Sequence, residues 1–150
     1  MTTTRLIEEL AAQIKKTLCK VRLPEESERE LSVNVFANYL PKEAFEDTSY
    51  LPYVCVEFLN LTDDLKDGST VQIGLTVATY AETADGWRGA FHIVEMLRQS
   101  LLARPVIARR FRLIDAQWEP PQGSQPLPFY YLVGVLEFSI YQPTEELLPA

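Results

Sequence analysis

The fold of this chain is decided by residues 70–104, TVQIGLTVATYAETADGWRGAFHIVEMLRQSLLAR. Apolar side chains alternate with other side chains over residues 70–80, and this period of two predicts a strand with one buried face. The apolar members that carry the pattern are Val71, Ile73, Leu75 and Val77.

The second half of this stretch changes to a period of three and four residues, which predicts an amphipathic helix. Its apolar stripe consists of Trp87, Ala90, Phe91, Val94, Leu97, Leu101 and Leu102. Asp85 can cap the start of the helix, and Pro105 prevents its continuation. A strand followed by such a helix buries both apolar faces if the helix lies across the sheet. We expect Trp87 and Phe91 to supply much of that contact, so truncating either to Ala should cost ~3–5 kcal/mol.

The remaining elements are predicted from the same two periods. Helical spacing covers residues 4–20, and strand character appears in residues 32–39, 53–59, 106–118 and 129–141. The connections are a charged linker (24–30), a segment with a short turn of helix (41–51), a long hairpin loop (60–69), a proline-rich loop (120–128) and a loose tail (143–150). The nearly continuous apolar run at 53–59 suggests a central strand covered on both faces. The order α-β-β-β-α-β-β predicts an α+β fold, a mostly antiparallel sheet of about five strands with two helices on one face.

Composition limits the class of protein. The chain has 150 residues, 47% of them hydrophobic, which suits a single domain over residues 1–150. Its longest apolar runs are too short to cross a bilayer, and its first residues do not have the pattern of a signal peptide. A net charge of -7 argues against specific binding to nucleic acid, which needs a cationic surface. Cys19 and Cys55 lie in apolar-periodic segments, and we expect two buried free thiols.

No catalytic signature is recognisable in the sequence. His92 is the sole histidine, and no second histidine or CxxC accompanies it as a transition-metal site would require. Gly86 and Gly89 do not form a phosphate-binding pattern. The thiolate of Cys55 would be disfavoured in an apolar strand. We therefore expect a protein that is not an enzyme and that has no cofactor and no metal.

An acidic segment lies in the predicted hairpin loop, with Asp63, Asp64 and Asp67 close together. One interpretation is a solvated turn. The alternatives are a weak divalent-ion site, through which such ions would affect assembly weakly, or a docking loop for a neighbouring subunit.

A basic segment, Arg109, Arg110 and Arg112, follows the second helix of this otherwise acidic chain. One interpretation is an exposed edge strand whose charges discourage aggregation. The alternative is a subunit contact that pairs with acids on the next copy, because the planar guanidinium suits interfaces.

Aromatic residues are a third feature, and they gather around the proline-rich loop. The set is Tyr39, Tyr50, Tyr53, Trp118, Phe129, Tyr130, Tyr131 and Tyr141. Much of this set is expected in the core, but aromatics beside such a loop could anchor a partner. A ligand pocket that uses Trp118, Tyr130 and His92 is a further alternative.

Over residues 6–142 the chain resembles the tail terminator (tail completion) proteins of long-tailed phages and prophages. The segments that carry the resemblance are VNVF (33–36), YLP (39–41), LPYVCV (51–56), VQIGL (71–75), ATY (78–80), WR (87–88), LR (97–98), FRL (111–113), WE (118–119) and QP (142–143). They follow an amphipathic helix, and an acidic hairpin loop lies between the third segment and the fourth.

The resemblance implies a structural protein that forms a ring, usually hexameric, on the end of the tail tube. Such a ring stops tube polymerisation and presents a surface for head joining. The implied partners are further copies of the chain, the tube protein and a head-completion or connector protein, with no membrane. The implied location is the virion tail, and the host cytoplasm during assembly. A ring built from one heterologous contact needs two unlike patches on each copy. We expect the acidic and the basic segment to be those patches. The alternatives are another head–tail connector, a contractile-tail component, or a small ligand-binding domain.

Overall fold

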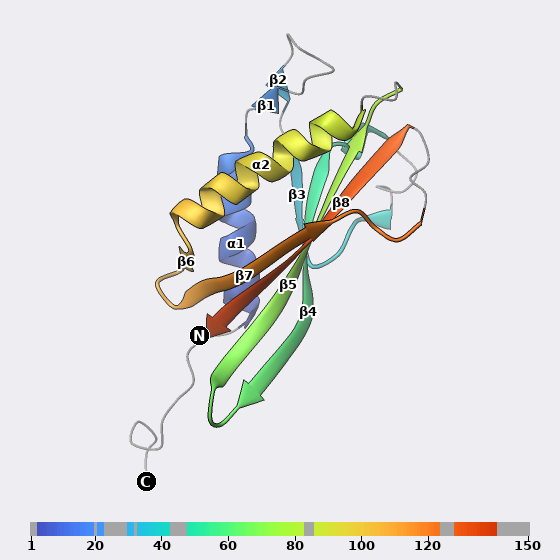
Figure 1. Ribbon diagram of the computed structural model, residues 1–150. Coiled ribbons are helices and arrows are strands. Elements are labelled where there is room, and N and C mark those ends of the chain that lie inside the picture. Colours follow the sequence, from blue (N-terminus) through green and yellow to red (C-terminus); the bar gives the residue numbers. More distant parts are fainter. Residues whose placement is uncertain are drawn as a thin grey trace.

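A six-stranded sheet forms the centre of the molecule. The structure is a computed structural model that describes residues 3–19, 21–22, 30–31, 33–42, 48–82, 86–123 and 128–140. The strands are β3 (Asn34–Ala37), β4 (Tyr53–Asp64), β5 (Gly68–Tyr80), β6 (Val106–Ile107), β7 (Phe111–Glu119) and β8 (Phe129–Ile140), in the order β3-β4-β5-β8-β7-β6. A short 3₁₀ helix, η3 (Thr48–Tyr50), precedes β4, and β1 (Val21–Arg22) pairs with β2 (Glu30–Leu31) in a separate ribbon (Figure 1).

The predicted α+β fold is confirmed, with two differences in the sheet. It has six strands instead of about five, because the predicted strand at 106–118 is split by a turn into β6 and β7. It is mixed, because β3 pairs in parallel with β4 while its other pairs are antiparallel. A parallel pair needs a crossover connection, and the segment that contains η3 supplies it.

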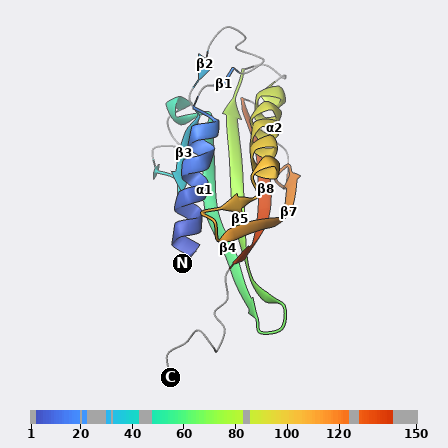
Figure 2. The same cartoon turned by 90° about the vertical axis from the view of Figure 1, so that its left-hand side faces the viewer.

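Both helices, α1 (Thr3–Thr17) and α2 (Trp87–Ala103), cover the same face of the sheet (Figure 2). They bury their stripes against the apolar face of the central strands in one continuous core, which is the main source of stability for such a layered domain. The predicted core positions Val71, Ile73, Leu75, Val94 and Leu97 all lie in it. No helix of the described residues is long and apolar enough to cross a membrane.

Trp87 and Phe91 do not lie in this core, which corrects the prediction made for them. Their exposed fractions are 42% and 44%, and their rings meet edge to face with centroids 5.8 Å apart. The buried stripe of α2 is centred on Ala90, Leu97 and Leu101. Because an α-helix turns by about 100° per residue, Phe91 points to the flank of that stripe. The aromatic pair therefore contributes less burial than its size suggests.

The predicted hairpin loop at 60–69 is wrong. Pairing between β4 and β5 continues as far as Asp64 opposite Gly68, and the connection is the short turn 65–67. The hairpin projects beyond the rest of the sheet (Figures 1 and 2). Side chains 60–64 are all exposed, so this part of β4 has no apolar face to produce a period of two. It is held by backbone pairing, which leaves little trace in a hydrophobicity pattern.

The face opposite the helices carries a smaller cluster. Tyr53, Cys55 and Ala78 are buried there against partly buried side chains, namely Phe36, Leu40, Leu51 and Tyr131. The first part of β4 is therefore covered on both faces as predicted, but Phe58 and Leu59 at the end of the predicted strand are exposed.

Two stretches of strand lack a sheet neighbour on one side among the described residues. The part of β4 after Val56 is one of them, because β3 pairs with β4 only as far as that residue. The part of β7 after Arg112 is the other, because β6 pairs only with Phe111 and Arg112. Each open edge carries a β-bulge, at Leu59 in β4 and at Ile114 in β7. The edge-strand interpretation was made for Arg109, Arg110 and Arg112, and none of them lies in the open part of β7, because two are in the turn and Arg112 pairs with Val106.

Several sequence predictions fall on residues outside the described ones. These are the capping role of Asp85, the linker at 24–29, the tail at 143–150 and the middle of the proline-rich loop at 124–127.

Candidate interaction surfaces

The acidic tip, residues 63–67, is held in shape by its own aspartates. The Asp64 carboxylate oxygen Oδ1 accepts hydrogen bonds from the backbone amides of Lys66, at 2.8 Å, and Asp67, at 3.2 Å. These two hydrogen bonds lower the pKa of Asp64, and the bond from Lys66 makes the larger contribution. Ser69 Oγ donates to Asp63 Oδ1 at 2.6 Å. The tip therefore presents its charges from a defined turn.

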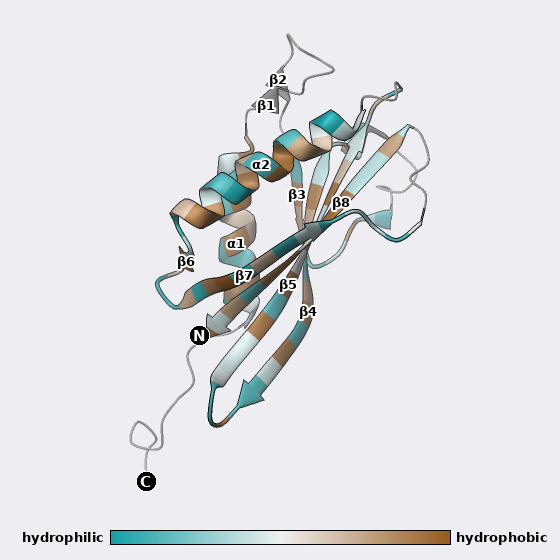
Figure 3. Ribbon diagram, in the orientation of Figure 1, coloured by the Kyte–Doolittle hydropathy of each residue, from teal (hydrophilic) through white to brown (hydrophobic). Residues whose placement is uncertain are grey.

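The acidic tip also carries an apolar side chain. Leu65 is 93% exposed between the acids, at the end of the projecting hairpin. Figure 3 colours the surrounding tip as hydrophilic. The described residues contain no group of three or more His, Cys, Asp or Glu side chains placed to hold a metal ion. The structure therefore offers no ligand set for the divalent-ion alternative, and an effect of such ions on assembly stays a prediction.

The basic turn, residues 107–110, joins β6 to β7. The backbone amide of Arg110 donates to the carbonyl of Ile107 at 3.1 Å. The two central residues, Ala108 and Arg109, have φ angles of 53° and 60°. This is the pattern of a type I′ hairpin turn, which normally uses Asn and Gly because a Cβ atom is strained at positive φ. Arg109 and Arg110 therefore lie in a turn instead of the predicted strand, while Arg112 lies in β7.

A hollow of about 350 Å³ lies beside the basic turn. Its lining combines three arginines with apolar and small side chains: Val106, Arg109, Arg110, Arg112, Ser139 and Ile140. Val106 is opposite Arg112, which is opposite Ser139 on β8, so these three share one face of the sheet. Ile107 and Phe111, their chain neighbours, are buried in the core on the other face. Ile140 differs, because it follows the core residue Phe138 by two positions and packs against the helix-side core. The hollow therefore lies at the end of the sheet, with most of its lining on the face away from the helices.

The acidic tip and the hollow lie at the same end of the sheet but on different sides of β8. β5 begins at Gly68 and pairs with the end of β8, while β7 begins at Phe111 on the other side of that strand. The two oppositely charged segments singled out in the sequence are thus brought to neighbouring but separate surfaces. One copy presents them in different directions.

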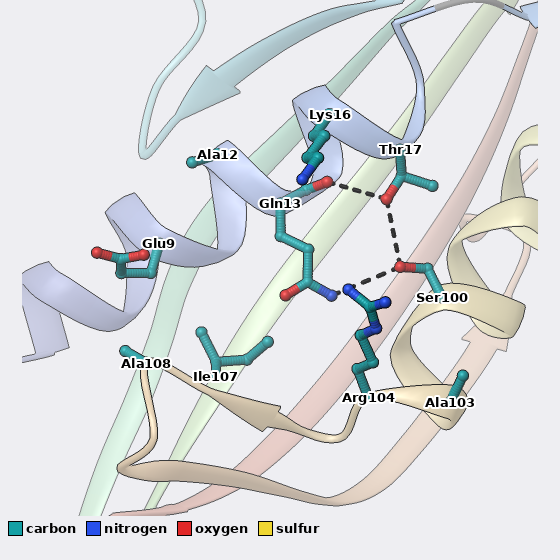
Figure 4. Close-up of a pocket in the computed structure, with 10 residues that line it drawn as sticks. All are labelled: Glu9, Ala12, Gln13, Lys16, Thr17, Ser100, Ala103, Arg104, Ile107 and Ala108. Carbon is teal, nitrogen blue, oxygen red and sulfur yellow. Dashed lines mark hydrogen bonds between the residues drawn. The ribbon is translucent and has the colours of Figure 1, made fainter.

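A groove of about 560 Å³ runs between α1, α2 and β6 (Figure 4). Thr17 Oγ1 lies 3.2 Å from Ser100 Oγ and donates to the Gln13 carbonyl at 2.9 Å, while Gln13 Nε2 donates to Ser100 Oγ at 3.5 Å. These bonds join the two helices. The hydroxyls already serve the helix contact. Lys16 and Arg104 also line the groove with exposed side chains, and the guanidinium group of Arg104 points toward Gln13 and Ser100 (Figure 4). Sequence reasoning did not find this groove, because it depends on how the helices meet.

The side chains of the predicted ligand pocket are not brought together. Trp118 lies under α2, where a cavity of about 90 Å³ is lined by neither Tyr130 nor His92. Its lining residues are Arg98, Leu101, Leu102, Leu113, Ala116 and Trp118. The indole ring of Trp118 packs over the backbone of Gly134 on the neighbouring strand. Trp118 is therefore a packing residue of the helix-covered face.

The two cysteines differ, which corrects the prediction of two buried thiols. Cys55 is buried and Cys19 is exposed, and both are free. Burial first, and then the charge of Glu57 and a hydrogen bond with it, raise the pKa of Cys55 from 9.0 to about 12. A thiol with this pKa remains protonated at neutral pH, so Cys55 has little nucleophilic character.

The sequence was compared with models of known protein families and with curated proteins, and neither comparison gave a match. The sequence did not predict that three apolar residues belong to the acidic tip and the hollow, namely Leu65, Val106 and Ile140. The available signal for Leu65 was a single large apolar residue within a turn of acids and a lysine.

Proposed function

We propose that this chain is a structural assembly protein of a phage or prophage tail, a terminator-like subunit that forms a ring on the tail tube. The ring would end tube polymerisation and present a surface for head joining, without catalysis. The observation that carries the proposal is the pair of unlike surfaces on either side of β8, the acidic tip and the arginine-lined hollow. A heterologous contact that closes into a ring requires two such surfaces on every copy.

The uncovered face of the sheet supplies a second argument. Among the described residues, the acids that point from it include Glu57, Asp115, Glu119 and Glu137. Asp115 and Glu137 are direct neighbours across β7 and β8, an arrangement that costs stability because like charges repel. An acidic area of this kind suits the lumen of a ring through which DNA passes, because it repels phosphates. The arginines of the hollow lie at the end of the same face, where a subunit contact would cover them.

The experiment is light scattering behind size exclusion over a concentration series, with and without millimolar magnesium. The proposal expects a closed assembly of about six copies that stops growing as concentration rises. Dependence on magnesium would point to the acidic tip. A chain that stays monomeric at the highest concentration, or that grows into open-ended polymers, would contradict a ring-forming cap.

A terminator is distinguished from another head–tail connector by what the assembly binds. Electron microscopy of the ring mixed with purified tail tubes should show density at one tube end and an arrest of further growth. Binding only to head portals would favour the connector alternative.

A further inference from the structure

We propose that the acidic tip of one copy seats in the arginine-lined hollow of the next copy, with Leu65 as the apolar anchor. This inference rests on the proposed ring and identifies its subunit contact. The occupant of the hollow is thus a second copy of this chain, presenting residues 63–67.

The apolar parts of the two surfaces match. Leu65 projects from the end of a hairpin that reaches beyond the sheet, with 93% of its surface exposed. The hollow offers Val106 and Ile140 as apolar contacts inside a volume of about 350 Å³. Seating an exposed apolar side chain against apolar residues removes both surfaces from water, which favours the contact.

The charges of the two surfaces also match. Asp63, Asp64 and Asp67 surround Leu65, and three arginines surround the apolar part of the hollow. Arginine binds carboxylates through paired N–H donors, which gives such contacts direction as well as strength. Because the tip turn is fixed by hydrogen bonds to Asp64, little freedom remains to be lost when the tip docks.

The backbone of the basic turn points to the same contact. Arg109 occupies a positive-φ position, at 60°, that glycine would occupy without strain. A strained backbone conformation that is retained at an exposed position is a sign of function. The structure assigns Arg109 the role of holding a guanidinium at the rim of the hollow.

The direct test is disulfide trapping between two different chains in a Cys19→Ser background. One chain carries Leu65→Cys and the other Val106→Cys, and the two are mixed and oxidised gently. A disulfide-linked heterodimer is expected. Leu102→Cys mixed with Val106→Cys is the matched control, since Leu102 is exposed on α2, and it should give no link. A link between two Leu65→Cys chains would indicate a tip-to-tip dimer and overturn the proposal.

The second test separates charge from backbone strain. Arg109→Gly removes the guanidinium and relieves the positive-φ strain, so we expect a higher midpoint of thermal unfolding and a self-association about tenfold weaker. Ala108→Gly relieves the neighbouring strain and keeps the arginine, so the midpoint should rise while self-association is unchanged.

The outcomes also separate this contact from the ring itself. If rings form but no Leu65–Val106 link appears and Arg109→Gly assembles normally, the contact is wrong and the ring stands. If the wild-type chain does not associate at any concentration, both are wrong.

Discussion

At the scale of single residues, Gly134 is a position where one added carbon would meet a neighbouring side chain at very short distance. A Cβ atom there would lie 2.6 Å from the Trp118 ring, which is fixed under α2. Gly134→Ala should therefore lower the free energy of unfolding by about 1–3 kcal/mol through overpacking. Urea denaturation measures this value.

Gly74→Ala is the matched control for that substitution. Its Cβ would meet the flexible Leu59 side chain at 3.2 Å on the open face, and that side chain can move aside. We expect a change of less than about 1 kcal/mol, in either direction. Equal losses at the two glycines would show that Trp118 does not define the packing at this point.

The buried thiol makes stability depend on pH in the alkaline range. The pKa of Cys55 is raised from 9.0 to about 12 in the folded chain, chiefly by burial. Above pH 9 the unfolded chain releases the thiol proton while the folded chain keeps it, so the free energy of unfolding falls as pH rises toward 12. Below pH 9 this contribution is fully present.

The free energy of unfolding, measured at neutral pH and at about pH 10.5, checks this prediction. The upper pH lies about midway between the pKa values of Cys55 in the unfolded and the folded chain. Cys55→Ala should reduce the slope, and Cys19→Ala, at an exposed thiol, should keep it. Tyr53 adds to the same fall. Its pKa is raised to about 12, first by burial and then by the neighbouring Tyr131, Cys55 and Glu57. An identical slope in both variants would contradict the assignment to Cys55.

At the scale of elements, α2 separates its buried stripe from its aromatic flank. Leu97 is 1% exposed, and Leu97→Ala should cost about 2–5 kcal/mol. Phe91 is larger but 44% exposed, so Phe91→Ala should cost less than Leu97→Ala. The comparison is made by urea denaturation under one set of conditions. A larger loss at Phe91 would mean that the aromatic pair is covered in solution.

The same helix illustrates what the sequence could predict. Its type follows from periodicity and its end from Pro105, and both are confirmed by the helix Trp87–Ala103 with its C-cap at Arg104. Its start was predicted one residue too early, since the N-cap position is Gly86 and not Asp85. Which of two neighbouring apolar residues faces the sheet depends on how the helix is rotated about its axis, by about 100° for each residue. The hydrophobic period does not determine this rotation. Trp87 and Phe91 were therefore assigned to the core by their size.

The charged surfaces were predicted only in part. Asp63, Asp64 and Asp67 and the three arginines were identified by charge alone. Their placement on either side of β8 depends on long-range strand pairing, which is not visible in local patterns. The exposed end of β4 was missed for a related reason, because strand prediction needs an apolar face and this segment has none.

At the scale of the whole molecule, the proposed lumen face has a cost that can be measured. Asp115 and Glu137 are directly opposed, so Glu137→Gln should raise the free energy of unfolding by about 0.2–1 kcal/mol at low salt. The gain should shrink at high salt because the repulsion is screened. Asp115→Asn should give a similar gain, and the double variant should give less than the sum. Additive gains would show that the two carboxylates do not repel each other.

The two bulges bear on how a chain with open edges stays out of fibrils. At Leu59 and at Ile114 two residues stand opposite one residue of the neighbouring strand. The order of amides and carbonyls therefore shifts at the bulge along each edge that has no strand partner within the described part of the chain. A straight strand from another molecule that is in register before the bulge is out of register after it. Neither edge can then act as a long template for cross-β stacking, the usual risk of crowding many copies of an unpaired strand. In the proposed ring, contacts made by side chains, and not by backbone ladders, would then select the neighbouring copies.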